Sequence, residues 1–157
     1  MQLEKYAIST CTHQNDFINF VQQLKRFDEQ ELRQPIVEGK WSVIEIIGHF
    51  IPWDEFILQH RVPYFFNGAT FPPGPNADKV NKQAALHARS DATHYTIEKC
   101  IQVRRQLVEA LTALPDEEWF VEMKINESTL TIYSYFEGLM AHDLHHIEQI
   151  KRALQII

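Results

Sequence analysis

Residues 42–58 read SVIEIIGHFIPWDEFIL, and their pattern determines which class of structure the chain can form. Ser42 is followed three positions later by Glu45, which is the spacing of a capping box and predicts that a helix begins here. The apolar residues that follow cover most faces of that helix. A helix of this kind is covered by neighbours on several sides, so we expect it at the centre of the domain.

Helical periodicity continues on both sides of this central segment. Before it, apolar residues recur at spacings of three and four, which predicts a helix over roughly residues 13–30. After it, the same pattern predicts a helix that begins at about residue 80 or 92 and ends at 114, where Pro115 stops it. A further helix is expected from about Thr131 to Leu154.

The segments between these helices differ in character. Residues 61–80 hold four of the seven prolines, which predicts a long irregular connection. Residues 119–130 alternate apolar and polar side chains around Asn126-Glu127, which predicts a small hairpin. We therefore predict a single all-α domain over residues 1–157, a four-helix bundle with a long connection between its second and third helices.

Composition limits the functions open to the chain. With 157 residues, of which 45% are hydrophobic and 23% charged, it has the make-up of one soluble domain. The net charge of −6 disfavours nucleic acids and anionic membranes as partners. No apolar run approaches the ~20 residues that a membrane-spanning helix needs. The two cysteines and the lack of a signal-peptide pattern predict a cytoplasmic location.

Histidine is the residue type that stands out, because the chain has eight and three of them lie between positions 142 and 146. Residues four apart share one face of a helix, so His142 and His146 can share one metal ion, a spacing that many zinc sites use. With His142 at 0° and ~100° per residue, His146 falls near ~40° and His145 near ~−60°, whereas the apolar stripe spans about 60–160°. His142 and His146 therefore border the buried face, and His145 points towards solvent.

A third metal ligand is expected from another helix. His49 is the only histidine in the middle of the buried second helix. His60 lies three turns further on, roughly 16 Å away at 1.5 Å per residue, which is too far for the same site. Three neutral imidazoles would leave a fourth position open, as in a catalytic zinc site, and the nucleophile would be a water or a thiolate on the metal. The alternative is that the three are core histidines that bond to neighbours.

Two acidic residues near these histidines have two interpretations each. Asp143 falls near ~100°, at the centre of the apolar stripe, and a buried carboxylate needs a partner. It either accepts a hydrogen bond from a ligand imidazole N–H or forms a structural pair with Arg104, Arg105 or a tryptophan N–H. Glu45 lies one turn before His49 and either supports that histidine or serves only the helix cap.

Three further residues are candidates for the surroundings of the site. Gln149 borders the histidine face of the last helix, and its role stays open. Trp53 lies one turn from His49, and Tyr135 lies near the His142 face. Trp53 and Tyr135 are candidate pocket residues, with a place in the core as the alternative.

Two stretches of the chain resemble a known family. They are GKWSVIEIIGHF, residues 39–50, and AHDLHHIEQI, residues 141–150. Both are similar to motifs of the DinB-like (YfiT-like) superfamily of metal-dependent enzymes, and the order of elements resembles that family over nearly the whole chain. The resemblance implies an up-down-down-up four-helix bundle, often a homodimer, whose metal triad maps onto His49, His142 and His146.

The resemblance also implies a function. Zinc and nickel are the usual metals of the family, and its characterised members include thiol transferases that use bacillithiol or mycothiol. We therefore expect a metal-dependent enzyme that acts on a small molecule, with thiol S-transfer or detoxification as the first hypothesis. A metal-dependent hydrolase and a non-enzymatic metal-binding bundle are the alternatives.

Overall fold

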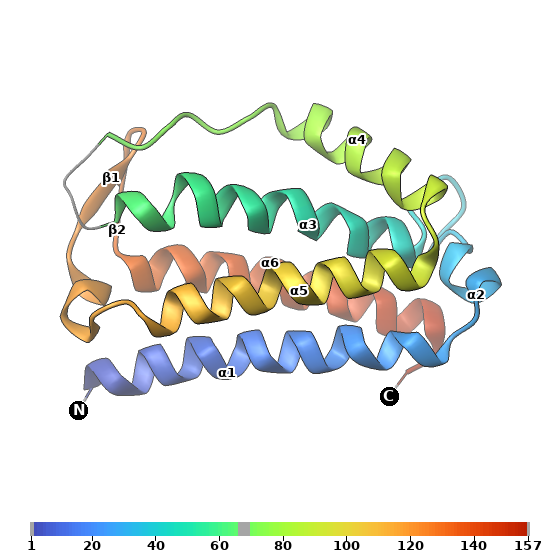
Figure 1. Ribbon diagram of the computed structural model, residues 1–157, viewed down its shortest axis with the longest axis horizontal. Helices are drawn as coiled ribbons and strands as arrows, with labels where there is room; N and C mark the ends of the chain where they lie inside the picture. The colour runs from blue at the N-terminus through green and yellow to red at the C-terminus, as the bar shows by residue number, and fades with distance from the viewer. Residues whose placement is uncertain (1, 66–69, 157) are drawn as a thin grey trace.

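Four long helices lie side by side and form the body of the molecule (Figure 1). The computed structural model describes residues 2–65 and 70–156. The four helices are α1 (Gln2–Gln23), α3 (Val43–His60), α5 (Thr93–Thr112) and α6 (Ile132–Leu154). This arrangement confirms the predicted all-α four-helix bundle. None of the described helices combines the length and the apolar character that crossing a membrane requires.

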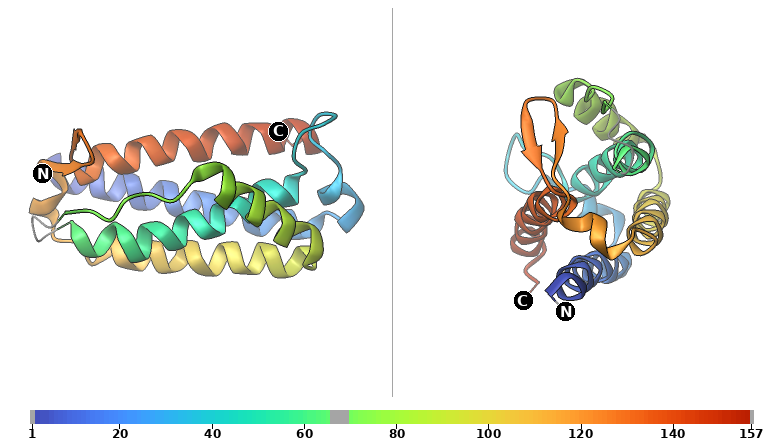
Figure 2. Two further views of the ribbon diagram at one scale, coloured as in Figure 1. Left: turned by 90° about the horizontal axis from the view of Figure 1, so that it is seen from above. Right: turned by 90° about the vertical axis from the view of Figure 1, so that its left-hand side faces the viewer.

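The directions of the helices explain the long connection in the middle of the chain. α1 and α6 run one way along the bundle, and α3 and α5 run the other way (Figure 1). Because α3 and α5 are parallel, the chain has to return along the bundle between them. The return path holds a short 3-10 turn, η2 (Val62–Tyr64), an irregular segment over residues 70–76, and α4 (Ala77–Ser90). α4 lies outside the four-helix bundle and packs against α3 (Figure 2).

The predicted helix that ends near residue 114 is divided in two. α4 begins at Ala77, where the Asn76 side chain accepts a hydrogen bond from the Lys79 amide at 3.0 Å. Asp91 and Ala92 both have extended backbone angles, so the chain leaves the helical path there before α5 begins. Of the two predicted starts for the third bundle helix, residue 92 is therefore the better one. Residues 66–69 of the predicted irregular connection lie outside the described residues.

The first bundle helix differs from its predicted bounds of 13–30. α1 already begins at residue 2, and a 3-10 turn, η1 (Leu24–Arg26), follows its end. Phe27 is extended, with φ −92° and ψ 146°, which ends the helical path. Asp28 then caps a separate short helix, α2 (Glu29–Arg33). The predicted end at residue 30 is wrong. The spacing of the apolar residues in the sequence continues through this region, although the backbone changes direction there.

Side-chain caps set the starts of α3 and α6. Ser42 accepts a hydrogen bond from the Glu45 amide at 3.3 Å, as the spacing predicts. The Glu45 carboxylate takes no part in this cap, because it accepts a hydrogen bond from Arg89 on α4 at 3.1 Å. Thr131 and Ser134 form a complete capping box at the start of α6. The predicted starts of these two helices are confirmed.

A two-stranded hairpin stands before α6. β1 (Met123–Ile125) pairs antiparallel with β2 (Ser128–Leu130), and a 3-10 helix, η3 (Asp116–Phe120), precedes them. Asn126 has φ 57°, a left-handed conformation that asparagine tolerates in tight turns. The hairpin predicted within residues 119–130 is confirmed.

A polar layer divides the apolar core of the bundle. One cluster of buried apolar side chains surrounds the first half of α3, and a second one gathers around the end of α3 and the hairpin. Between them, each of the four bundle helices contributes a buried polar or charged side chain. These side chains are Gln14, Asp54, Arg104 and Asp143.

Candidate metal centre

Three histidine side chains from two helices converge at one point of the bundle. His49 belongs to α3, and His142 and His146 belong to α6. Each offers a ring nitrogen, and the three nitrogens lie within 4.8 Å of one another. The Nε2 atoms of His142 and His146 are 3.2 Å apart. These are the three residues predicted as metal ligands, and the structure brings them together.

Hydrogen bonds on the far side of two rings determine which nitrogen faces the cluster. Nδ1 of His49 donates to the carbonyl oxygen of Ile46, one turn earlier in α3. Nδ1 of His146 donates to Oε1 of Gln149 at 2.8 Å. A ring proton on Nδ1 leaves the lone pair of Nε2 available for a metal ion. Gln149 therefore holds one of the candidate ligands in a defined orientation.

Loss of hydration keeps the three imidazoles neutral, although His49 is buried, His146 half-buried and His142 exposed. It is the main cause that lowers the pKa of His49 to about 4, since the charged ring would lose its water shell. Burial likewise lowers the pKa of His142 and that of His146. All three rings are uncharged at neutral pH, which is the form in which imidazole binds a metal.

The donor set fits a divalent transition metal. Catalytic zinc sites use three protein ligands, with Zn–N distances of ~2.0–2.1 Å for histidine, and keep one position open. Three nitrogens within 4.8 Å of one another can reach such an ion through small side-chain rotations. Among the described residues, no fourth histidine, cysteine or acidic side chain joins the group.

The other two histidines considered for this site lie apart from the group. His145 is exposed, and its ring centre is 5.3 Å from that of His146 on the outer side of α6. His60 is exposed at the end of α3, where its ring packs on Phe56. The position of His145 agrees with its predicted helical angle, and the position of His60 agrees with its predicted distance along α3.

The three histidines line a cavity of about 690 Å³ between α3 and α6. Of the neighbouring pairs of bundle helices, α3 and α6 pack least closely, so the cavity occupies the open seam between them. Its walls are rich in aromatic rings, and its volume is in the range of small-molecule sites. Both predicted pocket residues, Trp53 and Tyr135, are part of the lining, which also includes Trp41, Phe50 and Phe56.

Comparison with known proteins places the chain in a family. A family model described as the DinB superfamily matches residues 13–150. The chain belongs to the DinB superfamily. Among solved structures it is similar to YfiT from Bacillus subtilis, with a TM-score of 0.75, 13% sequence identity and coverage of 95% of this chain and 86% of that chain. That structure is described as a probable metal-dependent hydrolase with an unusual four-helix bundle topology. A comparison with curated proteins finds no match.

A fully paired arginine forms part of the cavity wall in this DinB-superfamily protein. Arg104 donates from Nε and Nη2 to Asp54, at 2.7 and 3.2 Å. It donates from Nη1 and Nη2 to Asp143, at 2.8 and 3.2 Å, and from Nη1 to Gln14 at 2.8 Å. These contacts use all five N–H donors of the guanidinium. Asp143 also accepts a hydrogen bond from His13 at 2.9 Å.

The contacts of the two acidic residues can be set beside their two interpretations. Asp143 is buried as predicted, and its hydrogen bonds go to Arg104 and His13 rather than to a candidate ligand. Burial by itself would raise the pKa of Asp143. The charge of Arg104 and the hydrogen bonds from His13 and Arg104 outweigh this effect and hold the pKa below its usual value. Glu45 pairs with Arg89, so its carboxylate joins α3 to α4.

The sequence did not lead us to choose the other members of the polar layer as candidate site residues. Arg104 appeared only as one of several possible partners for Asp143. Its position carried a usable signal, because it follows Ile97 by seven residues and Ile101 by three, which puts it on the apolar face of its helix. A charge on that face has to be paired, and Asp54, opposite on α3, supplies the second carboxylate.

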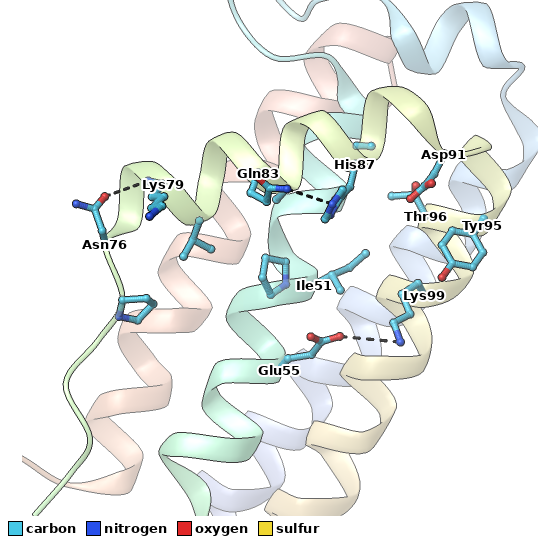
Figure 3. A pocket seen from close by; sticks show the side chains of 16 residues that line it. Ile51, Glu55, Asn76, Lys79, Gln83, His87, Asp91, Tyr95, Thr96 and Lys99 are labelled. Atoms are coloured by element: carbon cyan, nitrogen blue, oxygen red, sulfur yellow. Dashed lines mark hydrogen bonds and ion pairs between the residues drawn. The ribbon is translucent and has the colours of Figure 1, made fainter.

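A second cavity, of about 650 Å³, lies on the other side of α3, between α3, α4 and α5 (Figure 3). Its polar groups face one another: Glu55 and Lys99 are 4.0 Å apart, and Gln83 and His87 are 3.4 Å apart (Figure 3). None of the three converging histidines lines this cavity. The cavity between α3 and α6 is therefore the one that contains the candidate metal centre.

Proposed function

We propose that His49, His142 and His146 bind one divalent metal ion and that the protein is a metal-dependent hydrolase of a small molecule. The observation that carries this proposal is the convergence of three neutral imidazole donors on a cavity of about 690 Å³. The description of YfiT as a probable metal-dependent hydrolase supports the reaction class. The net charge of −6 and the aromatic lining favour a small-molecule substrate over a nucleic acid.

The residues of the chain prepare the site before any ion arrives. The Ile46 carbonyl and the Gln149 amide hold the rings of His49 and His146 with Nε2 directed at the cluster. Trp41 and Phe50 pack against the His49 ring, at centroid distances of 5.2 and 4.5 Å, and exclude water from its flank. A divalent ion bound there supplies Lewis-acid polarisation and activates water at neutral pH.

Thiol transfer stays a prediction. Neither cysteine lines the cavity, and burial raises the pKa of the Cys100 thiol, so the chain itself offers no reactive thiol at this place. A thiol reaction here would need a low-molecular-weight thiol as a second substrate. The choice of zinc or nickel, the homodimer and the cytoplasmic location also stay predictions.

Metal analysis followed by an activity screen tests the proposal. Protein without a histidine tag is analysed for its elements, stripped with a chelator and reloaded with zinc or nickel. We expect about one ion per chain and hydrolysis of activated ester or amide substrates only in the loaded form. A parallel assay with bacillithiol and monobromobimane measures thiol transfer. Thiol consumption without hydrolysis would replace the hydrolase by a transferase, and no metal uptake would overturn both.

Gln149 offers a separate test of the metal site. In Gln149→Ala the ring of His146 loses the acceptor that orients it, so we expect the dissociation constant for zinc to rise by about 10–100-fold. The constant is measured by competition with a chromophoric chelator. Glu148→Ala is the matched control, because Glu148 is the exposed neighbour in the same helix, and its constant should not change. Equal constants for the two variants would show that Gln149 does not support the site.

A further inference from the structure

A second positive charge is buried in the same cavity without an anionic partner. Arg61, the residue after α3, is 5% exposed and lines the cavity with the three histidines. The cavity contains two carboxylates, Asp54 and Asp143, and both are bound to Arg104. None of the side chains that the structure describes forms an ion pair with Arg61. Buried cations are normally paired, so this one calls for a partner.

The contacts of Arg61 hold its guanidinium in one place. Nη1 donates to the carbonyl oxygens of His60 and Pro72, at 2.9 and 2.8 Å. The guanidinium carbon lies 4.5 Å from the centre of the Phe56 ring. Nη2 lies beside Gly74, which also lines the cavity, and a Cβ at that glycine would be 4.0 Å from it. The backbone therefore anchors one edge of the guanidinium, and the Nη2 edge borders the cavity.

Arg61 and the three histidines lie at different ends of the same cavity. Tyr135 lies beside Arg61, and the nearby guanidinium partly offsets the rise that burial causes in the pKa of Tyr135. Tyr135 and His142 are seven residues apart on α6, which places them on the same side of the helix and their Cα atoms ~10 Å apart, whereas Arg61 follows His49 by twelve residues, ~18 Å along α3 at 1.5 Å per residue. The cavity thus has a cationic site at one end and three imidazoles at the other, with Trp53 and Phe56 in its wall.

We propose that Arg61 binds a carboxylate group of the substrate and so selects monoanionic molecules. This inference rests on the proposed function for the reactive end of the molecule, which would lie at the histidines. A guanidinium matches the planar, bidentate geometry of a carboxylate. A single carboxylate neutralises the one uncompensated charge of Arg61, whereas a dianionic phosphate would leave a second charge buried. The aromatic wall fits an apolar body between the two ends.

Ligand binding to the metal-free protein tests this assignment without relying on hydrolysis. The probes are 4-phenylbutyrate, its neutral amide 4-phenylbutyramide, and phenyl phosphate, each measured by calorimetry in the presence of a chelator. We expect 4-phenylbutyrate to bind at least about tenfold more tightly than the amide. Similar binding of acid and amide would overturn the proposal. Tighter binding of phenyl phosphate would overturn the choice of a carboxylate. Because no metal is present, failure of the hydrolase proposal cannot produce either result.

Variants separate recognition of the anion from the structural contacts of Arg61. Arg61→Gln should lose the tenfold preference for the acid, and Arg61→Lys, which keeps the charge, should retain part of it. Arg105→Gln is the matched control, because it removes the same charge from an exposed site on α5 and should bind as the wild type does. If Arg61→Gln binds the acid as tightly as Arg105→Gln does, Arg61 has only a structural role. Should Arg61→Gln fail to fold, the comparison of acid and amide on the wild type still decides whether the cavity prefers a carboxylate.

Discussion

Replacing Arg104 by methionine is expected to lower the free energy of unfolding by about 3–5 kcal/mol, the largest loss of stability that we expect from a single substitution in this protein. Methionine fills a similar volume but leaves Asp54 and Asp143 buried without a cation. It also removes the guanidinium that lies 3.7 Å from the centre of the Phe17 ring. Urea denaturation at pH 7, followed by circular dichroism, measures the change.

The pH dependence of this loss has a defined sign. In the wild type the pKa of Asp143 is held below its usual value, so the carboxylate stabilises the fold above pH ~4, and this contribution is lost as the pH falls. Without Arg104 the effect of burial prevails and raises the pKa of Asp143. As the pH falls, protonation of Asp143 therefore removes the unpaired buried charge that destabilises the variant. The contribution of Asp143 to the difference between wild type and variant should therefore shrink from pH 7 towards pH 4. A difference that grows over this range would contradict the expectation.

Arg105→Met is the matched control for Arg104→Met. Arg105 is the next residue of α5 and is exposed, so its replacement should change the free energy of unfolding by no more than about 0.5 kcal/mol. Equal effects of the two substitutions would mean that the polar layer does not depend on the Arg104 charge.

Removing any one of the three converging histidines is expected to weaken zinc binding by more than about 100-fold, because a site with three protein ligands would retain only two. The variants are His49→Ala, His142→Ala and His146→Ala. Purified without a tag, each should contain only background metal by elemental analysis. Added zinc raises the melting temperature of a protein that binds it in the folded state, and this rise should be absent from all three variants.

His145→Ala is the control for these variants. It removes an imidazole from the same helix, between two of the candidate ligands, but from the exposed face. We expect it to keep one ion per chain and the full rise in melting temperature. A loss of metal in His145→Ala equal to that in His146→Ala would show that metal binds at the surface of α6 and not at the cluster.

The parts of the fold that could be predicted from the sequence are those with local causes. The start of α3 depends on Ser42, and the start of α6 depends on Thr131, and each cap acts within its own first turn. The break between α4 and α5 carries no glycine or proline, so Asp91 and Ala92 do not interrupt the helical pattern in the sequence. The backbone leaves the helix there because α4 packs on α3 outside the bundle, which is a tertiary effect.

The residues of the candidate site also divide into those that local sequence patterns reveal and those that depend on tertiary contacts. His142 and His146 could be selected from helical angles alone, because their spacing and the apolar stripe belong to one helix. Choosing His49 required only that the second helix be central. Arg61 could not be selected in this way. Its importance comes from the lack of a carboxylate in the cavity that pairs with it, and this depends on contacts across the bundle.

The split of the histidines between α3 and α6 has a consequence for how the protein matures. A nascent chain has made His49 long before it makes His142 and His146, and domains acquire structure as they leave the ribosome. The complete chelating group cannot exist until α6 has been synthesised and has docked beside α3. If the proposed site binds a metal ion, loading would therefore be a late event of biogenesis, and a message truncated ahead of α6 would yield a polypeptide that cannot hold the ion through these three side chains.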